Sequence, residues 1–303
     1  AVNPDTLFVG EGWKMYNGEK GTVGMDQNYM TKTEKVAVFN DEFRDLAKAG
    51  GMSEAGQGFL TGKKVSIPDL FCNCSGKPVH NYSVTKPSSN VQYFACHDGL
   101  TLHDSIVNNI PLDESTEEGK IEAVNRLKLA NALLLTSQGI AFLHAGQERG
   151  RTKTAFTTAG TDDCETIGNF VKNSYDSSDN INNFVWNISD LNKNLLEYTK
   201  NLISIRKNNS AFTISTQDEV MSRISLLGEY CDDFFMAYKI ADSEGDWYLF
   251  FNSNKEDKKI DFPIENHTKL YADKEKVYPF GTECCLQDVV VRGSSVLFLR
   301  NVK

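Results

Sequence analysis

Four short apolar runs, each followed at once by polar or charged residues, constrain the fold of this chain more than any other feature. They lie in the segments 7–13 (LFVGEGW), 36–45 (VAVFNDEFRD), 91–98 (VQYFACHD) and 139–148 (GIAFLHAGQE). Continuous apolar runs of this length are typical of strands that are buried on both faces, as in parallel sheets. Because a buried charge costs free energy unless it is paired, we expect the polar residues at the open end of such a sheet.

Helical patterns separate and follow these runs. Segment 115–139 begins with a Ser115-x-x-Glu118 capping box, continues with apolar residues at helical spacing and reaches Gly139, which can end a helix. Segment 190–209 places apolar residues four and three positions apart on a single stripe. Buried strands that alternate with helices indicate an α/β fold, in which functional groups gather at the carboxyl ends of the strands.

The sequence pattern changes after about residue 212. Segment 213–303 consists of short alternating or aromatic runs separated by Gly, Asp and Asn residues, which is typical of an antiparallel β-sandwich. We therefore expect two domains, residues 1–212 with the α/β pattern and residues 213–303 with the sandwich. Because no long linker separates them, we expect the two domains to pack directly against each other.

Charge and composition argue against several kinds of partner. The net charge is −9 and the lysines and arginines form no cluster, so we expect no nucleic-acid partner. No run of about 18 apolar residues is present, so we expect no membrane partner. The seven cysteines lack a paired zinc-binding spacing and no complete calcium loop is present, so we expect no metal and no other cofactor. Free thiols suit a reducing compartment and favour a cytoplasmic location.

The four runs, in this order, resemble the α-amylase superfamily of glycoside hydrolases, and within it the debranching enzymes: pullulanases, limit dextrinases and isoamylases. FVGEGW resembles the strand that carries the general acid/base glutamate, and VAVFNDEFRD resembles the next strand of pullulanases. FACHDGLTLHD resembles the segment with the family's His-Asp pair, and segment 173–186 (NSYDSSDNINNFVW) resembles the loop after the last barrel strand. The resemblance covers nearly all of residues 5–210 and implies the carboxyl-terminal half of a (β/α)8 (TIM) barrel, followed by the β-sandwich.

The chain departs from the family pattern in two ways. Gly99 follows the His-Asp pair. Pullulanases usually have Asn at this position, whereas isoamylases often have Gly. The residue therefore leaves open which glycosidic linkage the protein prefers to cleave. The strands that carry the family's nucleophilic aspartate and its early histidine are absent from this sequence. Four parallel strands cannot close a barrel, and an open sheet exposes apolar edges. We therefore expect the amino-terminal half of the barrel as a partner of this chain, and we expect the chain alone to be inactive.

The resemblance assigns the central roles to three residues. Glu11 is the expected general acid/base, which protonates the leaving oxygen and later deprotonates water. Asp98 is expected to hydrogen-bond the hydroxyl groups of the sugar at the cleavage point, although by spacing alone it could be the nucleophile. His97 is expected to donate to the same sugar. The alternatives are a solvated glutamate at a strand end for Glu11 and a core histidine for His97.

Further residues that follow the first two runs are candidate substrate contacts. Trp13 and Phe43 could stack on glucosyl rings, although core packing is an equal alternative for Phe43. Asn40, Asp41 and Arg44 could bind sugar hydroxyl groups, although an ion pair between Asp41 and Arg44 explains them equally well.

The segment after the fourth run supplies the remaining candidates. Asn173, Tyr175 and Asn182 are expected to bind hydroxyl groups, with structural roles as the alternative. Structural roles are expected for four other polar residues, namely His103, Asp104, His144 and Glu148.

The resemblance implies a starch- or glycogen-degrading glycosidase that hydrolyses α-1,6-glucosidic linkages in pullulan, limit dextrins or related branched α-glucans with retention of configuration. One alternative is an α-1,4-acting amylase of the same superfamily. Another is a non-catalytic glycan-binding protein built on a decayed barrel. The combination of Glu11 with an intact His97-Asp98 pair argues against the last alternative, because a binding protein has no need for an acid/base.

Overall fold

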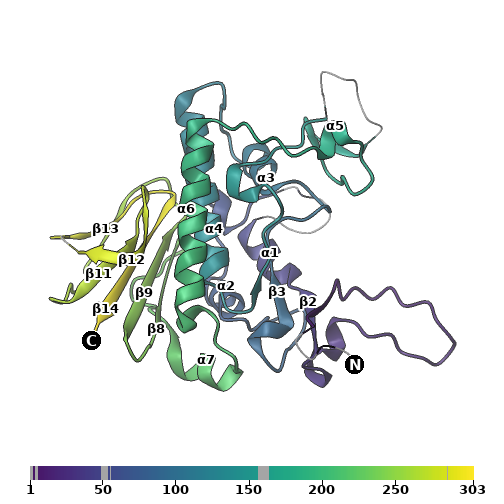
Figure 1. The fold of residues 1–303 in the computed structure, drawn as a ribbon, viewed down its shortest axis with the longest axis horizontal. Coiled ribbons are helices and arrows are strands. Elements are labelled where there is room, and N and C mark those ends of the chain that lie inside the picture. Colours follow the sequence, from purple (N-terminus) through teal and green to yellow (C-terminus); the bar gives the residue numbers. More distant parts are fainter. Residues whose placement is uncertain (1–2, 4–5, 49–53, 55, 156–163, 285) are drawn as a thin grey trace.

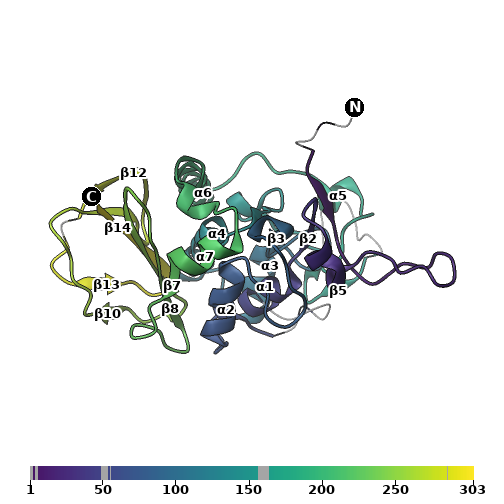
Figure 2. The ribbon, with the colours of Figure 1, turned by 90° about the horizontal axis from the view of Figure 1, so that it is seen from below.

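The computed structural model describes residues 3, 6–48, 54, 56–155, 164–284 and 286–303. Within these residues a parallel sheet with its helices and an antiparallel sheet lie at opposite ends of the molecule, and two long helices lie between them (Figures 1 and 2). None of the described helices combines the length and the apolar character that a membrane crossing requires.

The four apolar runs form one parallel sheet. Its strands pair in chain order, and they are β1 (Phe8–Gly10), β2 (Val36–Phe39), β3 (Asn90–Gln92) and β4 (Ile140–Ala141). The prediction of four neighbouring parallel strands is thus confirmed. β2 coincides with its apolar run, whereas β3 ends at Gln92 although the chain stays buried from Tyr93 to Ala95.

Both long helices predicted from the sequence are present. The α-helices are α1 (Asp41–Ala47), α2 (Ile67–Cys74), α3 (Leu102–Asn109), α4 (Glu117–Thr136), α5 (Asp179–Asn182), α6 (Asp190–Asn208) and α7 (Gln217–Arg223). Short 3-10 helices connect them: η1 (Gln27–Lys32), η2 (Phe59–Thr61), η3 (Pro87–Ser89), η4 (Gln147–Arg149) and η5 (Ser210–Phe212).

The start of α4 differs from the predicted capping box. Thr116 is the N-cap, and its side chain accepts a hydrogen bond from Gly119 N at 3.1 Å. The Ser115 hydroxyl instead donates to Asp113 Oδ1 at 2.6 Å, two residues earlier. The Ser115 cap was therefore wrong by one residue, because Asp113 competes for the serine hydroxyl.

Helix α4 lies at the centre of the molecule and is buried on almost all sides. It packs on α3 and α6 and also on the antiparallel strands β9 (Gly245–Asn252) and β14 (Ser295–Val302). Of the apolar residues at helical spacing in this segment, Ile121 is exposed near the start of the helix, whereas Val124 and Leu127 are buried. One continuous apolar core runs from α1, α2 and α3 through α4 and α6 to the antiparallel sheet.

The carboxyl-terminal strands form a six-stranded antiparallel sheet in the order β12-β11-β14-β9-β8-β7. Besides β9 and β14 it contains β7 (Ile224–Leu226), β8 (Phe235–Ile240), β11 (Thr268–Ala272) and β12 (Val277–Glu283), while β10 (Lys258–Ile260) pairs with β13 (Val289–Val291). Along β8, Met236 and Tyr238 face the helices, whereas Phe235 and Ala237 join a second core with β10 and β13. The alternation expected of a strand in a sandwich is therefore present, with both faces of the sheet covered.

A small hairpin lies in the segment after β4. It consists of β5 (Thr166–Ile167) and β6 (Phe170–Val171), which pair antiparallel. The chain then runs through residues 173–178 to α5, at the upper right of Figure 1. This segment contributes Asn173 and Tyr175 to the candidate site.

Candidate active site

The carboxyl ends of β1 and β3 bring together Glu11, His97 and Asp98. One side-chain nitrogen or oxygen atom from each residue lies within 4.8 Å of the corresponding atoms of the other two. His97 Nε2 lies 3.6 Å from Asp98 Oδ1. β2 lies between β1 and β3 in the sheet, and the residues that follow them converge because the carboxyl ends of all strands of a parallel sheet share one edge.

These three groups are accessible. Glu11 and His97 are exposed and Asp98 is partly buried. Two carboxylates and an imidazole at this spacing are also a conceivable ligand set for a divalent cation. Exposed acidic groups commonly cluster without a bound ion, so we assign no metal to them.

The turn between Glu11 and Trp13 requires glycine. Gly12 has a φ of +80°, and a Cβ atom there would lie 2.8 Å from Val38 Cγ1 of the neighbouring strand. A side chain would therefore push the turn away from β2. Gly12 O also accepts a hydrogen bond from Gln27 N at 3.0 Å, which fixes the turn that presents Glu11.

Gly99 occupies a similar position after the His-Asp pair. Its φ is +76°, a conformation that Asn also tolerates. A Cβ atom at this position would lie 1.9 Å from Glu54 Oε1, so the Glu54 side chain would have to shift to make room for it. An Asn at this position, as in the pullulanase pattern, would therefore require Glu54 to move.

The segment after β6 completes the cluster. Asn173 Nδ2 donates to Asp98 Oδ1 at 3.1 Å, and the two residues also form an antiparallel β-bridge. Ser174 N donates to His97 O at 3.2 Å. The Tyr175 ring is exposed, with its centroid 6.3 Å from that of His97. The structure thus brings Asn173 and Tyr175 to the Glu11–His97–Asp98 cluster.

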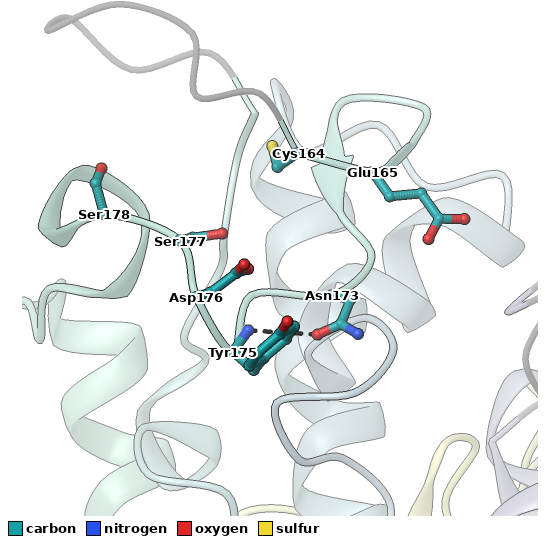
Figure 3. A pocket seen from close by; sticks show the side chains of 7 residues that line it. All are labelled: Cys164, Glu165, Asn173, Tyr175, Asp176, Ser177 and Ser178. Atoms are coloured by element: carbon teal, nitrogen blue, oxygen red, sulfur yellow. Dashed lines mark hydrogen bonds between the residues drawn. The ribbon is translucent and has the colours of Figure 1, made fainter.

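A polar pocket of about 370 Å³ lies beside these residues (Figure 3). Tyr175 N donates to Asn173 Oδ1 at 3.3 Å across its floor, and this bond is the dashed line in the figure. Hydroxyl, amide and carboxylate groups of this kind can bind the hydroxyl groups of a ligand. The lining residues are Cys164, Glu165, Asn173, Tyr175, Asp176, Ser177 and Ser178.

Asn182 lies in the same segment but its amide is used within the protein. Its Nδ2 donates to Ser174 O at 2.6 Å and to Ser177 O at 3.0 Å. Its Oδ1 accepts from Lys153 Nζ at 3.0 Å. The structure therefore gives Asn182, which we had predicted to bind substrate, the role of shaping the loop that carries Asn173.

Lys153 is a part of the site that the sequence did not reveal. Its ammonium donates to Ser174 Oγ and to Asn182 Oδ1, and the side chain is buried. Burial, and after it the positive charge of Arg151, lowers the pKa of Lys153 to about 8. A single lysine in an irregular segment carries no sequence signal for such a role, because the partners lie far along the chain.

The expected structural roles of His103 and Asp104 agree with their contacts. Asp104 lies in the first turn of α3 and accepts from Lys153 N at 2.8 Å and from the Thr152 hydroxyl at 2.5 Å. His103 lies between Asp104 and Glu114, at 3.1 Å and 2.9 Å. Burial lowers the pKa of His103, but hydrogen bonds to the two carboxylates and their charges outweigh burial and raise it to about 9.

Two further residues near the end of β4 also have local contacts. Glu148 Oε2 accepts from Gly146 N at 2.9 Å and thereby holds the turn that leads into η4. Burial, together with the charges of Lys153 and Arg151, lowers the pKa of His144 to about 4. An uncharged histidine and a turn-holding glutamate fit the structural roles that we expected for them.

Asn40 is fully buried at the end of β2, and this position does not suit the expected substrate contact. Its Oδ1 accepts from Phe43 N at 3.1 Å and caps α1. Its Nδ2 donates to Asn73 Oδ1 and to Gln92 Oε1, both at 3.0 Å. Every polar atom of the side chain therefore has a partner inside the protein, and the structure gives Asn40 a capping and bridging role.

Two candidates in α1 also face inward. Phe43 is fully buried with its ring 5.0 Å from that of Phe94, as the core-packing alternative predicts. Arg44 Nε contacts Asp45 Oδ1 at 2.7 Å and its Nη1 donates to the Tyr93 hydroxyl at 2.8 Å. In the described structure Arg44 therefore forms its ion pair with Asp45 and not with Asp41.

Asp41 and Trp13 lie together at a second opening. Gln27 Nε2 donates to Asp41 Oδ1 at 3.0 Å. A pocket of about 520 Å³ is lined by both residues and by Gln27, His80 and Asn81, among others. Trp13 is partly exposed there, two residues after Glu11, as a ring that stacks on a sugar would be.

Comparison with known proteins gives this geometry a family context. No protein-family model matches the chain. The chain is 41% identical over 155 residues to Pullulanase A of Streptococcus pneumoniae serotype 2, an alignment that covers 50% of this chain and 12% of that protein. The chain therefore spans a small part of the length of this curated relative.

Two similar solved structures extend the likeness to the whole chain. One is the catalytic module of the multi-modular glycogen-degrading pneumococcal virulence factor SpuA in complex with an inhibitor, with a TM-score of 0.89, 30% identity, and coverage of 99% of this chain and 49% of that one. The other is the Group B Streptococcus pullulanase SAP in complex with maltotetraose, with a TM-score of 0.86, 28% identity, and coverage of 100% of this chain and 44% of that one. In sequence and in fold, the chain is a relative of the carboxyl-terminal portion of pullulanase-type debranching glycoside hydrolases of the α-amylase family.

Proposed function

We propose that this chain supplies one half of an active site that hydrolyses α-1,6-glucosidic linkages in pullulan, limit dextrins or related branched α-glucans with retention of configuration. The observation that carries the proposal is the meeting of Glu11, His97 and Asp98 within 4.8 Å at one edge of the parallel sheet. The likeness to pullulanases and to a glycogen-degrading catalytic module supports the substrate class.

Glu11 acts as the general acid/base in this proposal. It protonates the glycosidic oxygen as the bond breaks, and in the second step it takes a proton from the attacking water. Its exposure at the end of β1 supports this role, because a general acid must reach the leaving group. The turn fixed by Gly12 holds the carboxyl group close to the His97-Asp98 pair.

Asp98 and His97 bind the sugar ring at the cleavage point. Asn173 occupies one lone pair of Asp98 Oδ1, so the carboxylate is oriented while its other lone pairs stay available for sugar hydroxyl groups. Hydrogen bonds from these hydroxyl groups strengthen as the ring flattens toward the oxocarbenium-like transition state. In this proposal the rings of Tyr175 and Trp13 stack on neighbouring glucosyl residues, which their exposure supports.

The nucleophilic aspartate, we propose further, comes from strands that complete the barrel around residues 1–212, while residues 213–303 form the packed sandwich domain. β1 and β4 are the two edges of the described sheet. Phe8 and Val9 on β1 and Leu7 just before it are exposed, although exposed apolar edge strands are normally avoided. A partner strand beside β1 and another beside β4 would cover both edges and close the barrel.

The segment that follows β1 supports the same proposal. It extends away from the rest of the described chain (Figures 1 and 2). Met15, Tyr16 and Val23 are exposed along it. Apolar side chains gathered on the side of β1 suit a surface that the rest of the barrel covers.

The proposed function is tested by incubating the full-length protein with pullulan and, separately, with linear amylose. Release of maltotriose from pullulan is the expected result. Cleavage of amylose alone would point to an α-1,4-acting amylase instead. Release of no reducing ends from either glucan would leave glycan binding as the function and contradict hydrolysis.

A further inference from the structure

We infer that Lys153 is a positioning residue for the Glu11–His97–Asp98 site. Its ammonium holds the segment of residues 173–182 through Ser174 and Asn182 and thereby keeps Asn173 on Asp98. This inference rests on the proposed function, since it concerns the geometry of the same site.

The contacts of Lys153 Nζ all point into this segment. The ammonium donates to Ser174 Oγ and to Asn182 Oδ1, and the residue is 4% exposed. Among the described residues, both hydrogen-bond acceptors of the ammonium are neutral oxygens. An ammonium that is buried with only neutral acceptors costs free energy. Its placement therefore calls for an explanation beyond general stability.

The backbone of Lys153 is fixed on two sides. Its N–H donates to Asp104 Oδ2 at 2.8 Å, and Asp104 is fully buried in the first turn of α3. Its carbonyl accepts from Val171 N at 2.9 Å, on strand β6. The base of the side chain is thus anchored to both α3 and the hairpin, so that the ammonium has a defined position.

A short series of hydrogen bonds and adjacent residues connects the Lys153 ammonium to Asp98. Ser174, which the ammonium holds by its hydroxyl group, donates its own N–H to His97 O at 3.2 Å. The preceding residue, Asn173, donates to Asp98 Oδ1 at 3.1 Å. Asn182, the second acceptor of the ammonium, holds Ser174 O at 2.6 Å. Loss of the ammonium would therefore loosen Ser174, which is hydrogen-bonded to His97 and is next to Asn173 in the chain.

The expected consequence is a misaligned Asp98. A shift of about 1 Å in a group that orients a reacting centre can lower a rate by about 100-fold. We therefore expect Lys153→Met in the full-length protein to lower kcat on pullulan by about 10- to 100-fold. The KM is expected to change by less than kcat, because Asp98 is proposed to act mainly on the transition state.

Three further variants separate positioning from general destabilisation. Lys153→Arg keeps the charge and the donors and is expected to recover most of the lost kcat. Ser174→Ala removes one acceptor without touching the lysine and is expected to lower kcat in the same direction. Lys172→Met makes the same substitution one residue before Asn173, where the lysine pairs with Glu165, and is expected to leave kcat unchanged.

The decisive measurement is a double-mutant cycle between Lys153→Met and Asn173→Ala, read as kcat on pullulan. If Lys153 acts through Asn173, the double variant is no slower than the slower single variant. The inference would be overturned if the fold-losses in kcat of the two single variants multiplied in the double variant. A Lys153→Met protein with wild-type kcat would overturn it as well. A purely structural role would lower the melting temperature without this dependence on Asn173.

The inference can also be tested apart from catalysis. Hydrogen exchange at the amides of residues 173–177 is expected to be faster in Lys153→Met than in Lys172→Met. Equal exchange in the two variants would refute the positioning role, whatever the enzymatic activity. If the wild-type protein leaves pullulan intact, the proposed function fails, and the exchange experiment alone decides the role of Lys153.

Discussion

The side-chain amide of Asn173 donates a hydrogen bond to the carboxylate of Asp98, with 3.1 Å between Nδ2 and Oδ1. This bond joins the end of β3 to the segment after β6, which lies far along the chain. It leaves the other oxygen of Asp98 available and fixes the direction in which the carboxylate points.

Glu11→Gln in the full-length protein is expected to keep substrate affinity and lose most turnover. General acid/base groups contribute about 10²–10⁴-fold to a rate, and an unactivated sugar leaving group needs its proton. The measurement is kcat on pullulan together with maltotetraose affinity by calorimetry. Glu19→Gln, at an exposed glutamate in the same segment, serves as the control. Turnover like that of the wild type would remove Glu11 from the mechanism.

Asp98→Asn is expected to lower kcat more than it raises KM. The hydrogen bonds of Asp98 to the sugar should strengthen in the transition state, so that their loss falls mainly on the chemical step. Steady-state kinetics on pullulan measure both constants. An effect on KM alone would make Asp98 an ordinary binding residue.

Asn40→Ala is expected to destabilise the fold by about 2–4 kcal/mol, because it removes the cap of α1 and leaves Asn73 and Gln92 with buried unpaired groups. The free energy of unfolding, measured with urea, gives the value. Substrate affinity of the folded variant should stay within about twofold of the wild type, since no polar atom of Asn40 is free for a ligand. A stable variant with weakened glucan binding would restore the role first expected for this residue.

His103 is expected to make stability depend on pH. Burial lowers the pKa of His103, but its hydrogen bonds to Asp104 and Glu114 raise it to about 9, above the value of about 6.5 in an unfolded chain. A pKa that is higher in the folded state gives stabilisation that is fully present below about pH 6.5 and is lost as the pH rises through about 9.

The matching experiment compares the free energy of unfolding of the wild type and of His103→Gln. The advantage of the wild type should be larger at about pH 6 than at about pH 9.5. Taking the difference between the two proteins cancels the opposite contribution of Lys153, whose pKa is lowered. A difference that stays constant with pH would show that the ion pairs of His103 do not stabilise the folded state.

The sequence was sufficient to predict the elements that apolar patterning controls. The four strands, helices α4 and α6 and the alternating strand β8 were expected from spacing, since burial dictates where apolar side chains stand. The convergence of Glu11 with His97 and Asp98 was expected because the ends of parallel strands share an edge.

The roles of single polar residues were harder to predict. An asparagine after a strand can bind a ligand or cap the next helix, and only the contacts of Asn40 with Phe43 and Asn73 distinguish the two. Ser115 and Thr116 are equally good caps by type, and Asp113 decides between them. These choices depend on partners whose positions the fold sets, not on local propensity.

The most direct test of the central claim measures reducing-end release from pullulan by the full-length protein and, in parallel, by residues 1–303 alone. The account predicts release by the full-length protein and none by residues 1–303, because the proposed nucleophile lies outside this chain. Release by residues 1–303 would contradict it and would place the nucleophile within the chain, with Asp98 as the first candidate.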